Sequence, residues 1–350
     1  LKADIAAPGA RHQILFLIVQ IRSFGIGRAK RHVGIKGGIG RHRNRRHMRL
    51  CLPMTLLFMR FLRRLPPGMR RIVLKRVDGE GLDRSLAKHG EIAYRHEGRL
   101  VHVDLRDRVG RQMVKHGFTE QPFIALVRRH FTDAQGCFLD IGANLGNYAL
   151  TLAPYFAKTL AFEPNPPVFA RLQRNVEANP KLRIEAFNIG LSSTSGTRAF
   201  FPNTQGNSGA SGFETRREGI EPLKLETLTG DEFVENLEQR IAAIKIDVEG
   251  HEFEVIRGLS RTIARDEPVI FMEWLGETME AKGGFETLHD LLPGYTFLAP
   301  AALSNDGRLK TAAPKHRLTE LTPLVAPYRR KYNMIYCVPD KQVGKLALRR

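Results

Sequence analysis

From Cys137 onward, short apolar runs alternate with longer stretches whose apolar residues recur at helical spacing. Short apolar runs bounded by polar turns are typical of buried strands, and an interval of three or four residues is typical of helices. This alternation predicts an α/β fold, with a mostly parallel sheet and helices on both faces. The expected strands are Phe138–Ile141, Leu160–Phe162, Ile184–Ile189, Ile241–Val248, Val269–Trp274, Tyr295–Leu298 and Met334–Val338.

Two further elements are expected before this alternation. The runs Ile92–Tyr94 and Leu100–Leu105 flank Glu97-Gly98, which predicts a hairpin, and the apolar stripe of Glu120–Phe131 predicts a helix. The domain organisation expected from these patterns is a hairpin with helices packing on the core at 72–136, the α/β domain at 137–340 and a short basic tail at 341–350.

The charge of the chain is concentrated at its start. The protein has 350 residues, with 55 Lys and Arg against 36 Asp and Glu, and a formal net charge of +19. Residues 1–71 hold 17 of the basic residues and a single acid, Asp4, so the remainder is nearly balanced. This segment lacks a sustained apolar period, and we expect a basic, disordered extension. Three roles stay open for it: a nucleic-acid or anionic-lipid contact, a targeting segment, or an upstream extension absent from the mature protein.

Composition and cysteine usage exclude several classes of protein. With 42% hydrophobic and 26% charged residues, the chain is neither wholly disordered nor collagen-like. The longest apolar run near its start, Ile14–Val19, is about a third of the ~20 residues that span a membrane. Cys51, Cys137 and Cys337 lie far apart without metal-site spacing, which indicates free thiols and a cytoplasmic location.

The end of the first predicted strand carries a glycine turn, Gly142-Ala-Asn-Leu-Gly146. Glycines let the backbone pass close to a ligand, and the following helix directs its N-terminus at it. The second strand ends at Glu163, 23 residues after Asp140, where a carboxylate can accept hydrogen bonds from a ribose diol. The candidate cofactor-binding residues are Asp140, Gly142, Asn144, Gly146 and Glu163, to which we add Asn188 in the third apolar run.

The turn fits neither of two common nucleotide sites. An NAD(P) site needs glycine where Asn144 stands, and a phosphate loop needs Lys-Ser or Lys-Thr where Asn147-Tyr148 follows. S-adenosylmethionine has no phosphate, and it needs one acid near its amino-acid end and another on its ribose. Asp140 and Glu163 supply both acids, so we predict S-adenosyl-L-methionine as the cofactor.

Three sequence blocks resemble the FkbM-type family of S-adenosylmethionine-dependent methyltransferases. They are Phe138-Leu-Asp-Ile-Gly-Ala-Asn-Leu-Gly-Asn-Tyr148, Ala161-Phe-Glu-Pro-Asn165 and Ile244-Lys-Ile-Asp-Val-Glu-Gly-His-Glu252, and Gly206-Asn-Ser-Gly-Ala-Ser211 is also similar. The resemblance covers about Leu100 to Leu275 and leaves residues 1–71 outside. It implies a Rossmann-like class I methyltransferase fold, with a seven-stranded sheet whose last strand is antiparallel. It also implies methyl transfer, usually to oxygen, on sugars, polyketides or other small natural products.

The third block supplies the candidate catalytic residues Asp247, Glu249 and His251. Methyl transfer is an in-line displacement that depends on positioning, and a hydroxyl acceptor must also lose a proton. His251 is the best-tuned base; Asp247 could orient it or take the proton itself, and Glu249 could fix the loop or bind substrate. His251 could equally be a helix-start residue without a proton role. The spacing Glu249-Gly-His-Glu252 fits no standard ligand pattern, so no metal is predicted.

The expected function is O-methylation of a hydroxyl on a sugar, lipid or other small natural product, with a small molecule or glycan as partner. Two alternatives are a nucleic-acid methyltransferase recruited by the basic tail and a non-catalytic binding module. Asn165-Pro-Pro resembles a motif of enzymes that methylate amino groups, but it follows the second strand instead of the fourth. This position weakens the nucleic-acid alternative. A weak membrane-surface contact through residues 41–71 is a further alternative. We expect residues 202–222 and 275–285 to face the substrate.

Overall fold

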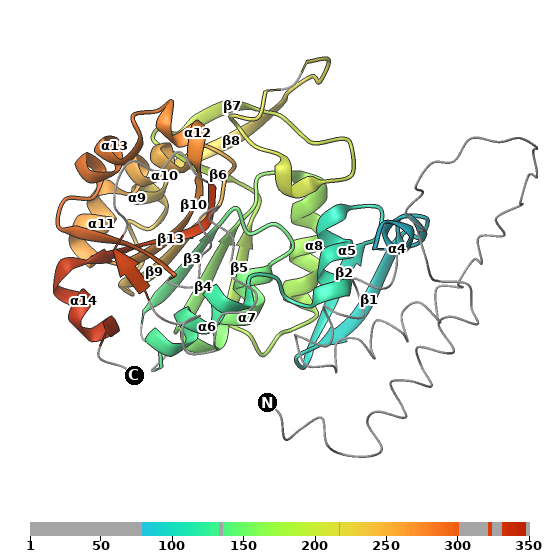
Figure 1. The fold of residues 1–350 in the computed structure, drawn as a ribbon, viewed down its shortest axis with the longest axis horizontal. Coiled ribbons are helices and arrows are strands. Elements are labelled where there is room, and N and C mark those ends of the chain that lie inside the picture. Colours follow the sequence, from blue (N-terminus) through green and yellow to red (C-terminus); the bar gives the residue numbers. More distant parts are fainter. Residues whose placement is uncertain (1–78, 133–135, 217, 301–320, 324–330, 348–350) are drawn as a thin grey trace, which may run out of the picture. The chain divides into compact units, whose positions relative to one another are not determined.

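The computed structural model describes residues 79–132, 136–216, 218–300, 321–323 and 331–347 (Figure 1). These residues form two compact units, the smaller of which comprises residues 79–91, 104–106 and 110–117. It contains helix α4 (Gly79–Leu86) and most of α5 (Arg108–His116). The Lys115 ammonium lies 2.8 Å from the Asp83 carboxylate, which links the two helices. The predicted extension at 1–71 lies outside the described residues.

The predicted hairpin is present as β1 (Glu91–His96) and β2 (Arg99–Asp104). Glu97 and Gly98 both have positive φ, 48° and 78°, as a tight two-residue turn between strands requires. Two asparagines satisfy backbone groups of β2: the amide nitrogens of Leu100 and His102 donate to the side-chain oxygens of Asn179 and Asn175 at 3.0 and 2.6 Å. These bonds pair a strand edge that would otherwise stay open.

The central sheet of the larger unit confirms the predicted Rossmann-like α/β fold. Its seven main strands have the order β11-β13-β10-β9-β3-β4-β5. β13 pairs antiparallel with both its neighbours, whereas β10, β9, β3, β4 and β5 pair in parallel. The strands are β3 (Cys137–Ile141), β4 (Lys158–Phe162), β5 (Ile184–Phe187), β9 (Ile241–Ile246), β10 (Val269–Leu275), β11 (Tyr295–Pro300) and β13 (Lys331–Pro339).

An eighth strand that the pattern did not predict, β12 (Leu321–Pro323), pairs antiparallel with β11 at the sheet edge. A three-residue strand is too short to show an alternation of apolar and polar residues, so the pattern did not reveal it. Beyond β13 the chain continues into α14 (Asp340–Ala347), which includes most of the segment 341–350 expected to form a short basic tail.

Helices cover both faces of the sheet, as Figure 1 shows. Phe138 and Phe271 stack on one face with centroids 5.8 Å apart, and Tyr148 of α7 packs on Phe271. On the other face, a buried cluster joins β3 and β4 to Phe253, Ile263 and other apolar residues of the covering helices. The first layer is α6 (Gln121–His130), α7 (Asn147–Leu152) with the 3-10 turn Ala153–Tyr155, and α8 (Pro166–Glu177); the second is α10 (Glu252–Gly258), α11 (Ser260–Asp266) and α13 (Gly284–Leu291).

A second sheet occupies the segment between β5 and β9. It has the strand order β6-β8-β7 and consists of β6 (Gly190–Ser192), β7 (Gly196–Phe200) and β8 (Leu223–Thr229). The long connection between β7 and β8 contains the 3-10 turn η2 (Ser208–Ala210). The short helices α9 (Gly230–Phe233) and α12 (Gly276–Glu280) complete the described elements.

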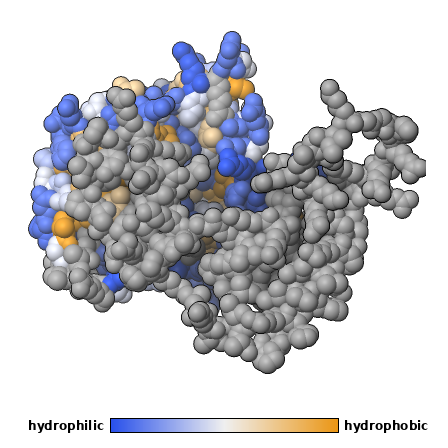
Figure 2. All heavy atoms as spheres, viewed as in Figure 1, coloured by the Kyte–Doolittle hydropathy of each residue, from blue (hydrophilic) through white to orange (hydrophobic). Residues whose placement is uncertain are grey.

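The described surface that Figure 2 leaves visible is mostly hydrophilic. Among the described residues, Leu223 is the one large hydrophobic residue whose side chain is exposed. None of the described helices is both long enough and apolar enough to cross a membrane. Cys137 and Cys337 are buried free thiols, in line with the expectation from their spacing.

Candidate active site

The candidate site lies where the carboxyl ends of β3, β4 and β9 meet. β3 is followed by α7 on one face of the sheet, and β9 is followed by α10 on the other, so the adjacent strands β3 and β9 flank the point where the chain changes face. A ligand crevice is expected at such a point. The structure has a cavity there, lined by Val109, Thr119, Glu120, Gly142, Ala143, Asn144, Asn147, Tyr148, Glu163, Pro164, Phe200, Ser208, Gly209, Ser211, Gly212, Phe213, Lys245, Asp247, Val248 and Glu249.

Gly142 allows the turn after β3 to pass directly beside the β9 loop. Its φ is +73°, and a Cβ atom there would lie 1.9 Å from the main-chain oxygen of Asp247. The amides of Gly142 and Ala143 both donate to the Phe162 carbonyl, at 3.0 and 2.9 Å. The turn is therefore fixed between two neighbouring strands, and a side chain at 142 would disrupt it.

The other two turn residues predicted for the cofactor have different positions. Asn144 lines the cavity with a φ of 50°, and its amide donates to the Glu163 carboxylate at 3.0 Å. Gly146 lies outside the cavity lining and is the N-cap of α7. A Cβ atom at Gly146 would lie 3.0 Å from Leu172 of α8, so this glycine permits close packing of the two helices.

Glu163 lies at the end of β4, at the opposite side of the turn, and lines the cavity. The side chain is buried, and its two oxygens accept hydrogen bonds from the amides of Asn144 and Asn165 at 3.0 and 2.9 Å. Burial raises the pKa of Glu163 to about 7, although the two main-chain bonds favour the ionised form. Asn165 is the N-cap residue of α8, but its side chain makes no capping bond.

Asn188 holds the same segment from outside the cavity. Its side-chain amide donates to the carbonyls of Glu163 and Pro164 at 2.8 and 2.9 Å, and its side chain is exposed. Asn188 is therefore placed to support the loop that carries Glu163, not to line the described cavity.

Asp140 and Lys245 form a buried pair beneath the turn. Asp140 is fully buried, accepts a hydrogen bond from the Ala149 amide at 2.8 Å and lies 3.4 Å from the Lys245 ammonium. It does not line the cavity, so in this arrangement it anchors the start of α7. Lys245 does line the cavity and donates to the Gly142 carbonyl at 2.7 Å.

The Lys245 ammonium also connects the turn to the β9 loop. It lies 3.8 Å from the Asp247 carboxylate and 5.6 Å from the centre of the Tyr148 ring. Burial lowers the pKa of Lys245, but Asp140 and Asp247 together raise it above the ordinary value, so the side chain stays charged. Sequence reasoning missed this residue, because a lysine within a strand ordinarily indicates an exposed edge.

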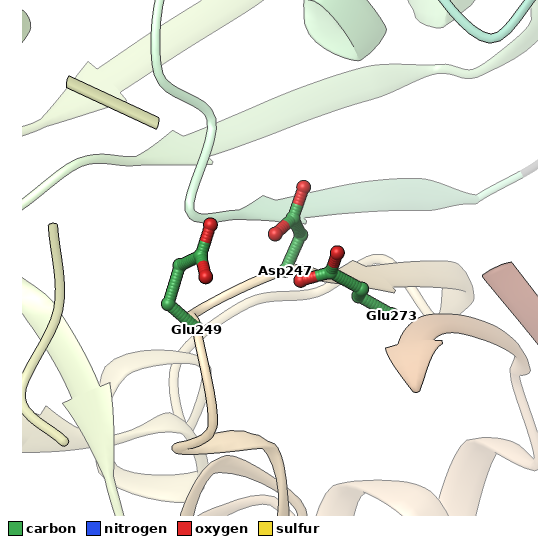
Figure 3. Close-up of side chains that lie close together, drawn as sticks. All are labelled: Asp247, Glu249 and Glu273. Atoms are coloured by element: carbon green, nitrogen blue, oxygen red, sulfur yellow. The ribbon is translucent and has the colours of Figure 1, made fainter. Parts of the chain in front are cut away.

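Three carboxylates gather at the ends of β9 and β10. Figure 3 shows Asp247 and Glu249 on the loop after β9 and Glu273 on β10, with side chains directed toward one another. One oxygen from each lies within 4.8 Å of the other two. An oxygen-ligand set of this kind suits a hard divalent cation. The sequence did not suggest the cluster, because Glu273 comes from a different strand.

Glu120 and Tyr148 form a further part of the cavity wall that sequence reasoning did not single out. The Tyr148 hydroxyl donates to the Glu120 carboxylate at 2.9 Å, and both residues line the cavity. Glu120 precedes α6 with a φ of 57°, which is uncommon for a residue with a side chain. Nothing in the local sequence pattern marks it as a site residue.

His251, the predicted base, is a buried residue at the start of α10. Its side chain is 2% exposed and does not line the cavity. One ring nitrogen lies 2.9 Å from the Ser192 hydroxyl and the other 2.9 Å from the Glu214 carboxylate, so both nitrogens are engaged. The bond from His251 lowers the pKa of Glu214 to about 2. The ring does not line the described cavity and both nitrogens are engaged, which favours a role in holding the loop, and the role of His251 as the base stays a prediction.

Glu252 supports the loop that presents the cavity carboxylates. It is fully buried, and one carboxylate oxygen accepts bonds from the amides of Val248 and Gly250 at 3.2 Å each. Burial raises the pKa of Glu252 to about 7. Glu252 thus fixes the main chain of the segment 247–251 through these hydrogen bonds, while Asp247 and Glu249 line the cavity.

Comparison with known proteins agrees with this geometry. Residues 140–298 match the methyltransferase FkbM domain. The hexuronic acid methyltransferase AglP of Haloferax volcanii is 38% identical over 125 residues, which cover 35% of this chain and 50% of that protein. Methyltransferase sdnD of Sordaria araneosa is 32% identical over 153 residues, covering 35% of this chain and 59% of that protein.

Among solved structures, a methyltransferase FkbM from Methylobacillus flagellatus KT has a TM-score of 0.38 and 14% sequence identity. The match covers 59% of this chain and 44% of that protein. The chain therefore spans about half the length of AglP and less than half of the Methylobacillus protein.

Proposed function

Because residues 140–298 match the methyltransferase FkbM domain, we propose that this protein transfers the methyl group of S-adenosylmethionine to a hydroxyl oxygen of a sugar or another small natural product. The observation that carries the proposal is a single cavity whose walls combine the glycine turn and Glu163 with the carboxylates Asp247 and Glu249. The first pair of features suits a nucleoside, and the second suits a hydroxyl group that must lose a proton.

The methyl donor is assigned to the side of the cavity formed by β3 and β4. There the Glu163 carboxylate would accept hydrogen bonds from the ribose hydroxyls, and Gly142 and Asn144 would let the backbone approach the amino-acid part. Asp140 acts indirectly, since it is buried beneath the turn with Lys245. When bound, the cofactor supplies an electrophilic methyl group on a sulfonium.

The acceptor hydroxyl is assigned to the side formed by the ends of β9 and β10. With S-adenosylmethionine bound, these residues would hold the acceptor oxygen in position to receive the methyl group that the cofactor would supply, with the neutral thioether S-adenosylhomocysteine as the other product. The hydroxyl proton passes to a carboxylate, for which Asp247 is the candidate because it lines the cavity beside Lys245. Glu249 binds the acceptor, and His251 fixes the loop from behind.

A sugar or related natural product as acceptor is supported by the name of AglP, a hexuronic acid methyltransferase. A cytoplasmic location is supported by the two buried free thiols, which persist in reducing compartments.

The test is a tritiated-methyl transfer assay from S-adenosylmethionine over glycosides, lipids and RNA, with analysis of the methylated atom. We expect label on the oxygen of a glycoside or small hydroxylated compound, and loss of labelling in Glu163→Gln. Glu185→Gln, which removes an exposed carboxylate on β5, is the matched control. Labelling of RNA alone would contradict the proposal. So would the absence of label on every acceptor while S-adenosylmethionine binds to the protein.

A further inference from the structure

Resting on the proposed methyl transfer, we propose that Glu214 and Lys282 are positioning residues for the methyl acceptor. Together with His251 they form a group of linked side chains, here called the Glu214 cluster. This cluster holds the cavity wall at Gly212-Phe213 against the loop that follows β9. Its three side chains lie outside the described lining of the cavity, so they would act on the acceptor through the residues that they hold.

His251 anchors the cluster at the start of α10. Its buried ring has Nε2 2.9 Å from the Ser192 hydroxyl and Nδ1 2.9 Å from the Glu214 carboxylate. Ser192 is the last residue of β6, so the ring is fixed between the second sheet and the β7–β8 connection. Because a buried ring holds one end of the bond, the Glu214 side chain has a defined position although it is 36% exposed.

Lys282 joins the same carboxylate to the β9 loop from another direction. It lies between α12 and α13, and its ammonium donates to the Gly250 carbonyl at 2.8 Å and lies 3.3 Å from the second Glu214 oxygen. Gly250 has a φ of +100°, and a Cβ atom there would lie 3.1 Å from Thr278 of α12 and 3.5 Å from the Cβ of Glu214. Three segments that are distant in the sequence therefore meet closely at Gly250.

The wall segment Gly212-Phe213 directly precedes Glu214 in the chain and lines the cavity. The Phe213 ring packs on the His251 ring, with centroids 5.3 Å apart. A Cβ atom at Gly212 would lie 3.2 Å from the Cβ of Glu249, so the wall also touches the loop that carries the cavity carboxylates. A small displacement of this segment would therefore change the space between the wall and the loop, where the acceptor is assigned.

The charges of the cluster support a fixed arrangement at neutral pH. The hydrogen bond from His251, opposed by partial burial and aided by the charge of Lys282, lowers the pKa of Glu214 to about 2, so the carboxylate stays ionised. Ion pairs between exposed side chains contribute little to stability. Here, however, one partner is buried and the other also donates to a main-chain carbonyl, so the pairs are tied to the body of the protein.

Hydrogen exchange on the full chain tests the holding of the wall without any acceptor. Glu214→Ala removes the group that joins the other two members of the cluster. The amides of Phe201 and Gly212 bond to each other's carbonyls at 2.9 and 3.3 Å. We expect both amides to exchange about tenfold faster in the variant, with exchange in the turn 142–146 unchanged. Unchanged exchange of both amides would overturn the proposal.

The matched control is Glu226→Ala in the same small sheet. Glu226 is an exposed carboxylate on β8 that accepts a hydrogen bond from the Thr197 hydroxyl at 2.7 Å. Its removal costs one side-chain bond, as a surface substitution does, but leaves the Glu214 cluster complete. Exchange of the two amides and the KM of the acceptor should both stay at the wild-type values.

Kinetics test the positioning role itself. The acceptors are p-nitrophenyl β-glucoside, p-nitrophenyl β-glucuronide and any other hydroxylated compound that takes the label in the proposed assay. In Glu214→Ala we expect the acceptor KM to rise about tenfold and kcat to change less than about threefold, because the wall contacts the acceptor in the ground and transition states alike. Glu214→Gln keeps the size of the side chain and should show a smaller rise. Equal weakening of acceptor and S-adenosylhomocysteine binding would indicate a merely structural role and overturn the proposal.

A second substitution tests whether the residues act together. Lys282→Met removes the ammonium and should raise the same KM. Because both residues belong to one cluster, the double variant Glu214→Ala/Lys282→Met should exceed the more affected single variant by no more than about twofold. Effects on KM that multiply would show that the two residues act separately, which contradicts the cluster.

Calorimetry with S-adenosylhomocysteine on the same preparations separates this proposal from the proposed function. If the wild-type protein neither binds this compound nor labels any acceptor, the proposed methyl transfer fails, whatever the exchange data show. If the wild type transfers methyl groups and Glu214→Ala leaves the acceptor KM unchanged, the proposed function stands and the positioning role is wrong.

Discussion

The two sides of the cavity are built in different ways. On the side of β3 and β4, Glu163 is held by the amides of Asn144 and Asn165, so main-chain hydrogen bonds fix the site. On the side of β9 and β10, Asp247, Glu249 and Glu273 are brought together from two strands as side chains. Main-chain geometry is hard to vary by substitution, whereas side chains change one at a time. The difference fits the proposal that the first side binds the methyl donor and the second side the acceptor.

The largest loss of activity is expected from a substitution on the acceptor side of the cavity. Asp247→Asn removes the candidate proton acceptor while keeping the shape of the side chain, and we expect kcat to fall by roughly 10²–10⁴. The dissociation constant of S-adenosylhomocysteine should change little, which calorimetry checks. Asp290→Asn, an exposed position on α13, is the control. Normal turnover in Asp247→Asn would leave positioning alone as the source of the rate.

A substitution at Gly142, which lies between the two sides of the cavity, should disturb both of them. Gly142→Ala places a Cβ atom 1.9 Å from the Asp247 main-chain oxygen at a φ of +73°, so we expect a loss of about 3 kcal/mol in the free energy of unfolding. Gly294→Ala has a similar φ of +77° with no atom within 4 Å, and it should cost only about 1 kcal/mol. Urea unfolding measures the difference, and equal losses would show that the close approach to Asp247 is unimportant.

His251 distinguishes a supporting residue from a catalytic one. His251→Asn disrupts buried hydrogen bonds to Ser192 and Glu214, so we expect a loss of about 2 kcal/mol in the free energy of unfolding. The shape of the pH–kcat profile should persist in the folded variant. Disappearance of a limb from that profile, with cofactor binding intact, would restore His251 as the base.

The contrast between the two sides also explains how much the sequence could reveal. Gly142, Asn144 and Glu163 are local signals at strand ends and line the cavity, whereas Gly146 of the same turn does not. Asp247 and Glu249 were predicted for the same reason, because they follow directly after β9. His251 follows them in the same motif, but the start of α10 turns its ring toward Ser192 instead of the cavity, which spacing alone does not reveal.

Other parts of the site depend on distant segments that only the fold brings together. Lys245 is a charged residue inside a buried strand, and it is tolerated because Asp140 and the Gly142 carbonyl lie beside it. Glu120 and Glu273 reach the site from before α6 and from β10. The β7–β8 connection supplies cavity residues as expected of 202–222, whereas residues 275–285 are absent from the described lining.

The central claim, that Glu163 binds the ribose of the methyl donor, is tested most directly by titrating the protein with S-adenosylhomocysteine at pH 6 and pH 8. Burial raises the pKa of Glu163 to about 7, so this carboxyl group is mostly protonated at pH 6 and mostly ionised at pH 8. Only the ionised form accepts hydrogen bonds at both oxygens, and we therefore expect about tenfold tighter binding at pH 8. Glu163→Gln should bind more weakly than the wild type at pH 8 and lose this pH dependence. Equal affinities of variant and wild type at both pH values would contradict the account.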